Sequence, residues 1–179
     1  SVSKTLNIDS LKYGQDKNLM FQLDTSQTSS SRDHICELIQ VSLRIGDKVI
    51  KGNPCVGPTI DYHLEQTYRH KAISILDDCI LKKKYSGGIL FNAIDFNLFI
   101  AQLKKYALTN EYIRNILFDF EGQVRESLNM TYQGESENWF NRWGIHYLRS
   151  LMQAYKNEIC NNFKDKGVSN FGGKLFDQL

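Results

Sequence analysis

The spacing of the apolar residues changes once along this chain, at a short segment that holds both of its prolines. In the clearest runs before residue 53, apolar residues recur at every second position, which is typical of half-buried β-strands. After residue 60 they recur three and four positions apart, which is typical of amphipathic helices. Pro54 and Pro58 lie between these parts. The sequence therefore predicts an α+β fold with a β-strand unit over 1–52, a linker over 53–60, and a helical domain with a tail over 61–179.

Two runs predict strands in the first part, over residues 18–23 and 35–45. Between them, the polar segment 24–33 is rich in small hydroxyl residues and is typical of an exposed hairpin loop. Gly46 and Asp47 predict a tight turn into a further short strand. Because so few strands make a marginal sheet, we expect this small antiparallel β-unit to pack on helices or on protein outside this chain.

Four helices are predicted in the second part, over 61–84, 93–107, 110–129 and 137–161. Asp61 and Thr109 are the expected caps of the first and third helices. Gly144 interrupts the fourth, and we expect another backbone to come close there. The tail from residue 163 is expected to be irregular. The apolar stripe of the fourth helix is expected to face inward and consists of Trp139, Phe140, Trp143, Tyr147, Leu148, Leu151 and Tyr155.

Charge and composition exclude two classes of protein. The 22 Lys and Arg residues nearly balance the 20 Asp and Glu residues, which excludes a nucleic-acid binder that works through a large basic surface. No apolar run approaches the roughly 18 residues needed to span a membrane. The overall composition is typical of an ordinary globular domain. Because the chain begins with Ser1 and opens directly into strand-like sequence, we expect it to be a piece of a longer polypeptide.

Cysteine usage favours a cytoplasmic location. No two of the four cysteines form a CxxC pair, and their spacing matches no zinc site. Cys79 and Cys160 lie in apolar helical stretches and are expected to be small core residues. Reduced thiols in an intracellular protein are the favoured interpretation, with two disulfides as the alternative. The four cysteines are Cys36, Cys55, Cys79 and Cys160.

One motif resembles a metal site. Asp24, Ser26 and Thr28 form a D-x-S-x-T pattern after an apolar run, and carboxylate and hydroxyl oxygens are ligands of hard divalent cations. Such a site also needs a helix directly after the motif, but the next ordered segment is predicted to be a strand. An exposed loop explains the same residues, so we expect no bound metal.

The histidines give no clear catalytic group. His63 and His70 lie seven residues apart on one predicted helix, and no carboxylate completes a ligand set with them. His146 lies among aromatic residues and is expected to be buried and hydrogen-bonded to backbone. An acid–base role for His146 with a nearby carboxylate such as Asp165 stays an alternative. The chain contains no phosphate-binding glycine loop and no nucleophile elbow.

Two stretches resemble a known family. They are residues 11–23, LKYGQDKNLMFQL, and residues 139–173, which include WFNRWGIHYLRSL and CNNFKDKGV. Both are similar to the region that follows the A domain in von Willebrand A/Hint-type proteins. Arg149 and Lys166 stand where family members often have proline, which affects backbone stiffness rather than chemistry. The resemblance implies a β part that completes a sheet, a helical part behind it, and no transferable catalytic residue.

Together these observations predict a non-enzymatic scaffold or protein-interaction module of a larger A-domain protein. We expect no catalytic residue, no cofactor and no metal. The expected interface consists of Trp139, Trp143, His146 and Tyr147. Expected partners are other proteins, as flanking domains of the same polypeptide or in a multi-protein assembly, and not nucleic acid or membrane. The alternatives are an A-type adhesion domain that binds metal through Asp24, Ser26 and Thr28, and a structural subunit of a large assembly.

Overall fold

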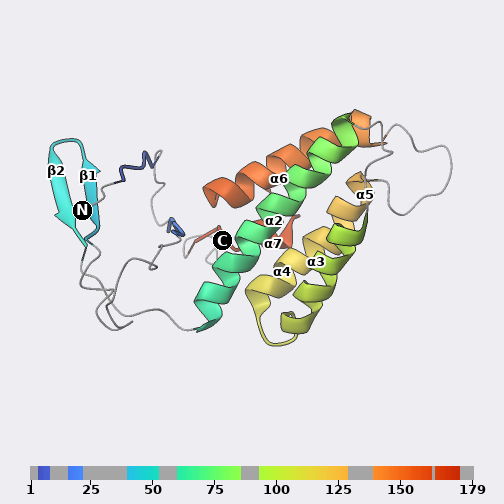
Figure 1. Cartoon of the computed structure of the whole chain (residues 1–179), viewed down its shortest axis with the longest axis horizontal. Helices are drawn as coiled ribbons and strands as arrows, with labels where there is room; N and C mark the ends of the chain where they lie inside the picture. Colours follow the sequence, from blue (N-terminus) through green and yellow to red (C-terminus); the bar gives the residue numbers. More distant parts are fainter. Residues whose placement is uncertain are drawn as a thin grey trace, which may run out of the picture. The chain divides into compact units, whose positions relative to one another are not determined.

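The fold is mixed α+β and mostly helical, as predicted, and its elements fall into two compact units (Figure 1). The computed structural model describes residues 4–8, 16–21, 40–52, 60–85, 93–128, 139–162 and 164–173. One unit combines Ser1–Leu19 with Leu64–Leu179, and the other spans Met20–His63. The predicted limits of 1–52, 53–60 and 61–179 stay predictions. Within the described ranges, no helix is long and apolar enough to cross a membrane.

The second unit contains a β-hairpin. β1 (Ser42–Ile45) pairs with β2 (Lys48–Lys51) in antiparallel register, and Leu43 lies opposite Ile50. The predicted turn at Gly46 is confirmed, and its φ of 57° is a left-handed value that favours glycine. Alternation along the strands puts Val41, Leu43, Ile45 and Ile50 on one face, and all four are exposed.

The strand predicted over residues 18–23 is wrong for its described part, because residues 18–21 form no strand. The N–H and C=O of Asn18 bind side chains of the helical unit instead. A neighbouring strand would need the same two groups. The strand predicted over 35–45 is confirmed over Ser42–Ile45, whereas residues 22–39 lie outside the described residues, so the predictions for them are open.

The four predicted helices are confirmed, with small differences at their ends. α2 (Ile60–Tyr85) and α3 (Ala93–Tyr106) match the expected ranges to within one residue. The helix predicted over 110–129 is divided by a kink: α4 (Glu111–Asp119) is followed by Phe120–Val124, where Gly122 has a non-helical backbone (φ −90°, ψ −108°), and then by the short α5 (Arg125–Ser127). A π-helical turn, Phe140–Gly144, leads into α6 (Ile145–Asn157). The tail also contains α7 (Lys166–Ser169), so its predicted irregularity is wrong there.

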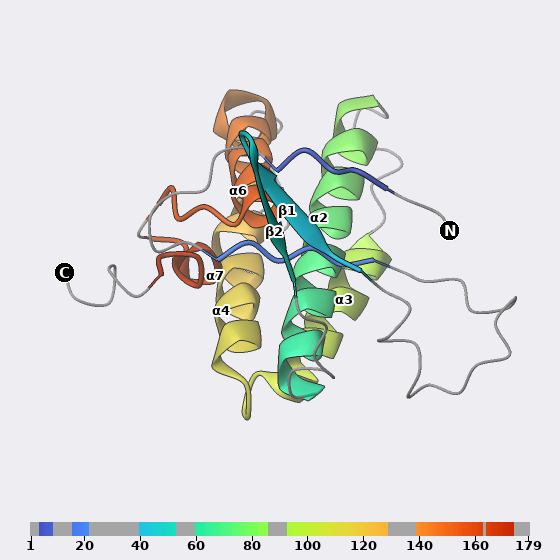
Figure 2. The same cartoon turned by 90° about the vertical axis from the view of Figure 1, so that its left-hand side faces the viewer.

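The helices enclose one aromatic and aliphatic core. Figure 2 shows α4 and α6 on one side of this unit and α2 with α3 on the other. The rings of Phe99 and Phe120 meet edge to face, 5.0 Å apart between centroids. The predicted stripes supply most of the core, which includes Tyr68, Ala72, Leu76, Phe96, Leu103, Ile113, Ile116, Val124, Phe140, Leu148, Leu151 and Tyr155.

The start of α4 corrects one predicted cap. Asn110, not Thr109, is the N-cap, because its side-chain oxygen accepts a hydrogen bond of 2.9 Å from the N–H of Ile113. The hydroxyl of Thr109 instead donates to the carbonyl of Tyr106, at 3.3 Å. Asp61 lies in the first turn of α2, one residue inside the helix rather than at its cap.

The predicted close approach at Gly144 is confirmed. A Cβ placed on Gly144 would collide with the backbone carbonyl oxygen of Ser127, and it would lie 3.2 Å from the carbonyl carbon of that residue. Gly144 is buried at the point where α5 meets the start of α6. A side chain here would therefore push two backbones apart rather than displace a flexible group.

Replacing Gly144 with Ala is expected to lower the free energy of unfolding by about 1–3 kcal/mol, the usual cost of overpacking. Urea unfolding followed by circular dichroism measures this change. Arg149→Ala is the control, because Arg149 is exposed on α6 and its loss removes no core contact. Equal stability of the Gly144→Ala variant and the wild type would contradict the close approach.

Candidate functional site

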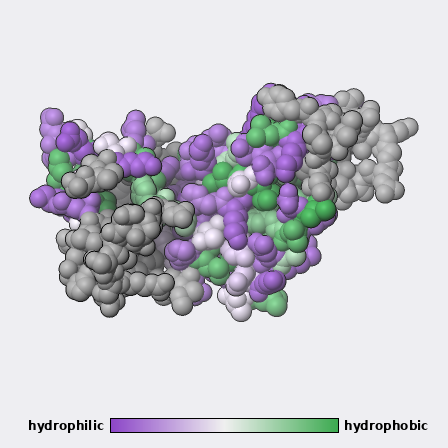
Figure 3. Space-filling model, in the orientation of Figure 1, coloured by the Kyte–Doolittle hydropathy of each residue, from purple (hydrophilic) through white to green (hydrophobic). Residues whose placement is uncertain are grey.

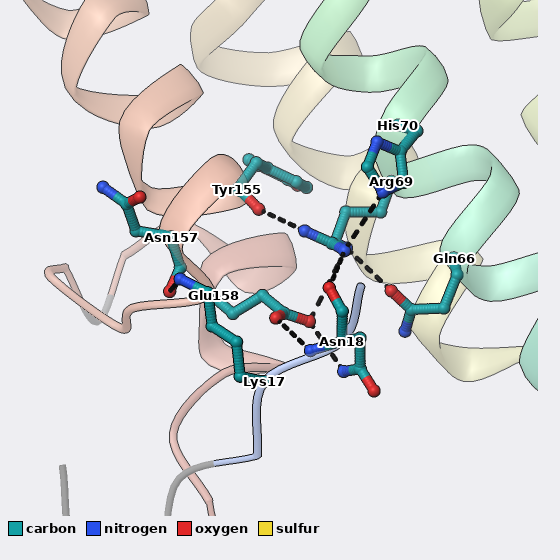
Figure 4. Close-up of polar contacts among 8 residues, drawn as sticks. All are labelled: Lys17, Asn18, Gln66, Arg69, His70, Tyr155, Asn157 and Glu158. Atoms are coloured by element: carbon teal, nitrogen blue, oxygen red, sulfur yellow. Dashed lines mark hydrogen bonds and ion pairs between the residues drawn. The ribbon is translucent and has the colours of Figure 1, made fainter. Parts of the chain in front are cut away.

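A buried arginine of α2 reaches into the helical unit beside the end of α6 (Figure 4). The side chain of Arg69 is only 2% exposed. Its Nε donates to Gln66 Oε1 at 2.8 Å, and its Nη1 donates to the backbone carbonyl of Tyr155 at 2.8 Å. These two bonds fix the plane of the guanidinium. Its third nitrogen, Nη2, donates to the backbone carbonyl of Asn18 at 3.1 Å.

Glu158 is the acidic partner of Arg69. Its side chain is 3% exposed, and its Oε1 lies 3.7 Å from Arg69 Nε. The same carboxylate accepts the N–H of Asn18 at 2.6 Å and the side-chain amide of Asn18 at 2.7 Å. Glu158 directly follows α6 and has a left-handed backbone (φ 53°, ψ 51°), which turns the chain at the helix end. We call Arg69, Glu158, Gln66 and the backbone carbonyl of Tyr155 the main-chain clamp.

The clamp holds residues from a distant part of the sequence. Asn18 and Glu158 are 140 residues apart, and Lys17 Nζ adds a bond of 3.2 Å to the carbonyl of Asn157. Lys17 therefore places its charge at the negative end of the α6 dipole. Burying one charge of the clamp without the other would be costly, so the pair and its hydrogen bonds form one unit.

A second buried polar cluster joins α4, α6 and α7. Asp119, at the end of α4, is 2% exposed. Its Oδ2 accepts the hydroxyl of Tyr155 at 3.1 Å and the N–H of Gly167 at 2.9 Å. A Cβ on Gly167 would collide with the Tyr155 hydroxyl and lie 2.6 Å from Asp119 Oδ2, so only glycine fits there.

Asp165 lies beside this cluster. Its two carboxylate oxygens accept the hydroxyl of Tyr147 at 3.0 Å and the side-chain amide of Asn162 at 2.9 Å. Burial raises the pKa of Asp165, and these two hydrogen bonds oppose the rise. Burial, and then the charge of Asp165, raise the pKa of the Tyr147 hydroxyl, which therefore stays a donor at neutral pH.

Asp119 is the most strongly perturbed carboxyl group of this cluster. Burial and then the nearby charge of Asp165 raise its pKa from 3.8 to about 7, against the hydrogen bonds from Gly167 and Tyr155. Its Oδ1 is buried and has no hydrogen-bond partner. Asp119 therefore changes its protonation state near neutral pH, well above the range of an ordinary carboxyl group.

This shift predicts a pH dependence of stability. The folded chain binds the Asp119 proton more tightly than the unfolded chain, so the free energy of unfolding falls as pH rises from about 4 to about 7. The slope from one such group is at most about 1.4 kcal/mol per pH unit. Asp119→Asn removes the titration and keeps an oxygen for Tyr155 and Gly167, so we expect a smaller loss of stability between pH 5 and pH 7.

Urea unfolding at pH 5, 6, 7 and 8 measures the two slopes. Asp77→Asn is the control, because Asp77 is exposed on α2. An unchanged slope in Asp119→Asn, or an equal change in Asp77→Asn, would contradict the assignment.

The structure keeps the three predicted aromatic interface residues in contact, because the ring of Trp143 packs against both Trp139 and Tyr147. Trp139 is 50% exposed, so its predicted inward orientation is wrong. Trp143 and Tyr147 are half-buried and stack edge to face, 5.7 Å apart between ring centroids. His146 is exposed rather than buried, because on the helix it points away from the stripe of Leu148 and Leu151. In the part of the chain that the structure describes, no hydrogen bond or ion pair joins His146 to Asp165.

Of the remaining candidate residues, His70 contacts the clamp, because its Nε2 lies 3.3 Å from Nη2 of Arg69 (Figure 4). His63 and His70 are exposed on α2, and burial and then the charge of Arg69 lower the pKa of His70. Cys79 is a buried core residue, as predicted, and burial raises its pKa to about 12. Asp24, Ser26 and Thr28 lie outside the described residues, as do Cys36 and Cys55. Among the residues that the structure does describe, no three His, Cys, Asp or Glu side chains gather to hold a metal ion.

The surface of the helical unit contains a shallow hollow between α2 and α3. It has a volume of about 280 Å³ and is lined by Ile75, Leu98, Phe99 and the charged side chains of Lys71, Asp78 and Asp95. Figure 3 shows hydrophobic residues interspersed with hydrophilic ones on the face that it presents. The hollow lies on α2 and α3, and its lining does not include the buried carboxylates Asp119, Glu158 and Asp165.

Comparison with known proteins identifies one part of the chain. Residues 110–179 match the model of the family described as VWA / Hh protein intein-like. The matched region begins at the Asn110 cap of α4 and includes both Asp119 and Glu158. The match confirms the resemblance of residues 139–173 to a VWA-associated, intein-like region, and the resemblance of residues 11–23 stays a prediction. Searches of curated proteins and of solved structures found no match to this chain.

Proposed function

We propose that this chain is a non-enzymatic protein-interaction module of a larger protein with a von Willebrand A domain. The observation that carries the proposal is the exposed edge of an aromatic stack at the start of the last long helix. Trp139 is 50% exposed and packs edge to face on Trp143, 6.2 Å apart between ring centroids. Exposed tryptophan held rigidly by a neighbour is the type of residue that dominates protein interfaces. Tyr147 and the exposed His146 complete the proposed surface.

The use of the buried ionisable groups supports the non-enzymatic part of the proposal. Arg69 and Glu158 bind backbone groups of the chain itself. Asp119 and Asp165 bind tyrosine hydroxyls, a backbone N–H and an amide. These contacts hold elements together, whereas a general acid or base has to reach a substrate.

The β-hairpin supports a role in binding other proteins. A two-stranded sheet is marginally stable by itself, and the apolar face of this hairpin is exposed at Val41 (61%), Ile45 (58%) and Ile50 (53%). A further sheet or helix over this face would bury these side chains. The proposed partners are flanking domains of the same polypeptide or members of a multi-protein assembly.

We also propose a cytoplasmic location, which the free thiols of Cys79 and Cys160 support.

The metal-binding alternative depends on Asp24, Ser26 and Thr28, which the structure does not describe. The alternative of a structural subunit in a large assembly would use the same aromatic surface and differs only in the partner.

Trp139→Ala is expected to remove most of the partner binding and leave the fold intact. The immobilised full chain and its variant are incubated with native extract, and the captured proteins are quantified by mass spectrometry. Loss of one tryptophan anchor costs about 2 kcal/mol or more of binding free energy, so the specific partners should fall at least about tenfold.

Phe118→Ala is the matched control, because Phe118 is a 61% exposed aromatic residue on α4, outside the proposed surface. The control should capture the same proteins as the wild type. If Trp139→Ala also captures them in equal amounts, the aromatic surface is not the interface.

A further inference from the structure

The main-chain clamp holds the bound residue by both of its backbone groups. The N–H of Asn18 donates to Glu158 and the C=O of Asn18 accepts from Arg69, so both backbone groups of one residue are held. This is the pattern by which a sheet edge binds an added strand, with side chains supplying the donor and the acceptor. The clamp therefore recognises the main chain of the bound residue.

The clamp is organised by contacts that do not involve its occupant. Gln66 and the carbonyl of Tyr155 fix the guanidinium of Arg69. The backbone of Glu158 is set by the end of α6. A site that is shaped in advance binds with less loss of conformational entropy. Without Asn18, the buried carboxylate of Glu158 would lose two hydrogen-bond donors. Binding of an equivalent segment is favoured because it restores both hydrogen bonds.

Two side chains give the site its sequence preference. The amide of Asn18 donates to Glu158 Oε1, where an aspartate would place a second negative charge. Lys17 donates to the carbonyl of Asn157. The following residues, Leu19, Met20 and Phe21, are exposed, so recognition centres on the Lys-Asn pair. The preferred occupant is a segment with lysine followed by asparagine.

The chain order makes this segment exchangeable between copies. The helical unit is built from two pieces, Ser1–Leu19 and Leu64–Leu179, with the whole of Met20–His63 between them. An element joined through a long intervening segment can reach the same site on another copy, and its exchange for an identical element costs little because the same contacts form again. We propose that the clamp accepts the Lys17–Asn18 segment of a second copy of this chain, which yields an exchanged dimer. This inference does not depend on the aromatic surface.

The test mixes two full-length variants. Asn18→Asp carries an intact clamp and a poor segment, and Glu158→Gln carries an intact segment and a poor clamp. The two are refolded together from urea and analysed by size-exclusion chromatography with light scattering across a dilution series. The proposal predicts a heterodimer in the mixture, while each variant alone stays monomeric.

The double variant Asn18→Asp/Glu158→Gln is the matched control. It should form no dimer with either single variant, because each of these mixtures lacks either an intact segment or an intact clamp. A mixture that stays monomeric would overturn the proposal. In a mixture of Asn18→Asp with the double variant, neither chain carries an intact segment. A heterodimer in that mixture would also overturn the proposal.

If Glu158→Gln does not fold, a fluorescent peptide of residues 11–23 takes its place as the source of the segment. The Asn18→Asp chain should bind this peptide, and a peptide with aspartate at the position of Asn18 should bind at least about tenfold more weakly. Absence of binding, or equal binding of both peptides, would overturn the proposal. If Asn18→Asp itself does not fold, Asn18→Ala replaces it.

Discussion

The buried ion pair between Arg69 and Glu158 is the interaction on which the helical unit depends most. Each charge is almost fully removed from water, and the desolvation cost is offset only while both charges and their hydrogen bonds are present. The pair contacts three parts of the chain: α2, the end of α6, and the segment at Asn18. Because these parts are far apart in sequence, their positions are set by this polar contact as well as by the apolar core.

Tyr155 connects this pair to the second polar cluster. Its backbone carbonyl accepts from Arg69, while its hydroxyl donates to Asp119, so one fully buried residue belongs to both networks. Through Asp119 the network continues to Gly167 of α7. The two clusters therefore tie α2, α4, α6 and α7 to one another, and a charge change at Asp119 acts on the same element that supports the clamp. This arrangement suits a module that holds and presents surfaces, as the proposed function requires.

Most of the helical fold could be predicted from the sequence, and much of the polar site could not. The stripes of Phe96, Phe99 and Leu103, and of Ile113, Ile116 and Phe120, follow helical spacing and form the core. The close backbone contact at Gly144 could also be predicted, because a glycine interrupts an otherwise helical pattern there. The burial of Arg69 could not be predicted, because an arginine next to the core residue Tyr68 on a helix is usually an exposed side chain. The contact of Asn18 joins backbone groups across 140 residues and leaves no pattern in side-chain spacing. The exposure of His146 could not be predicted from its aromatic neighbours in the sequence, because the buried stripe of α6 is set by Leu148 and Leu151.

Hydrogen exchange at the backbone amide of Asn18 tests the central claim most directly, because that N–H donates to Glu158 in the buried pair. Measured by NMR at several pH values, it should exchange far more slowly than an unstructured amide, and the protection should be lost in Glu158→Gln. Exchange of the Asn18 amide at the rate of an unstructured chain would contradict the account.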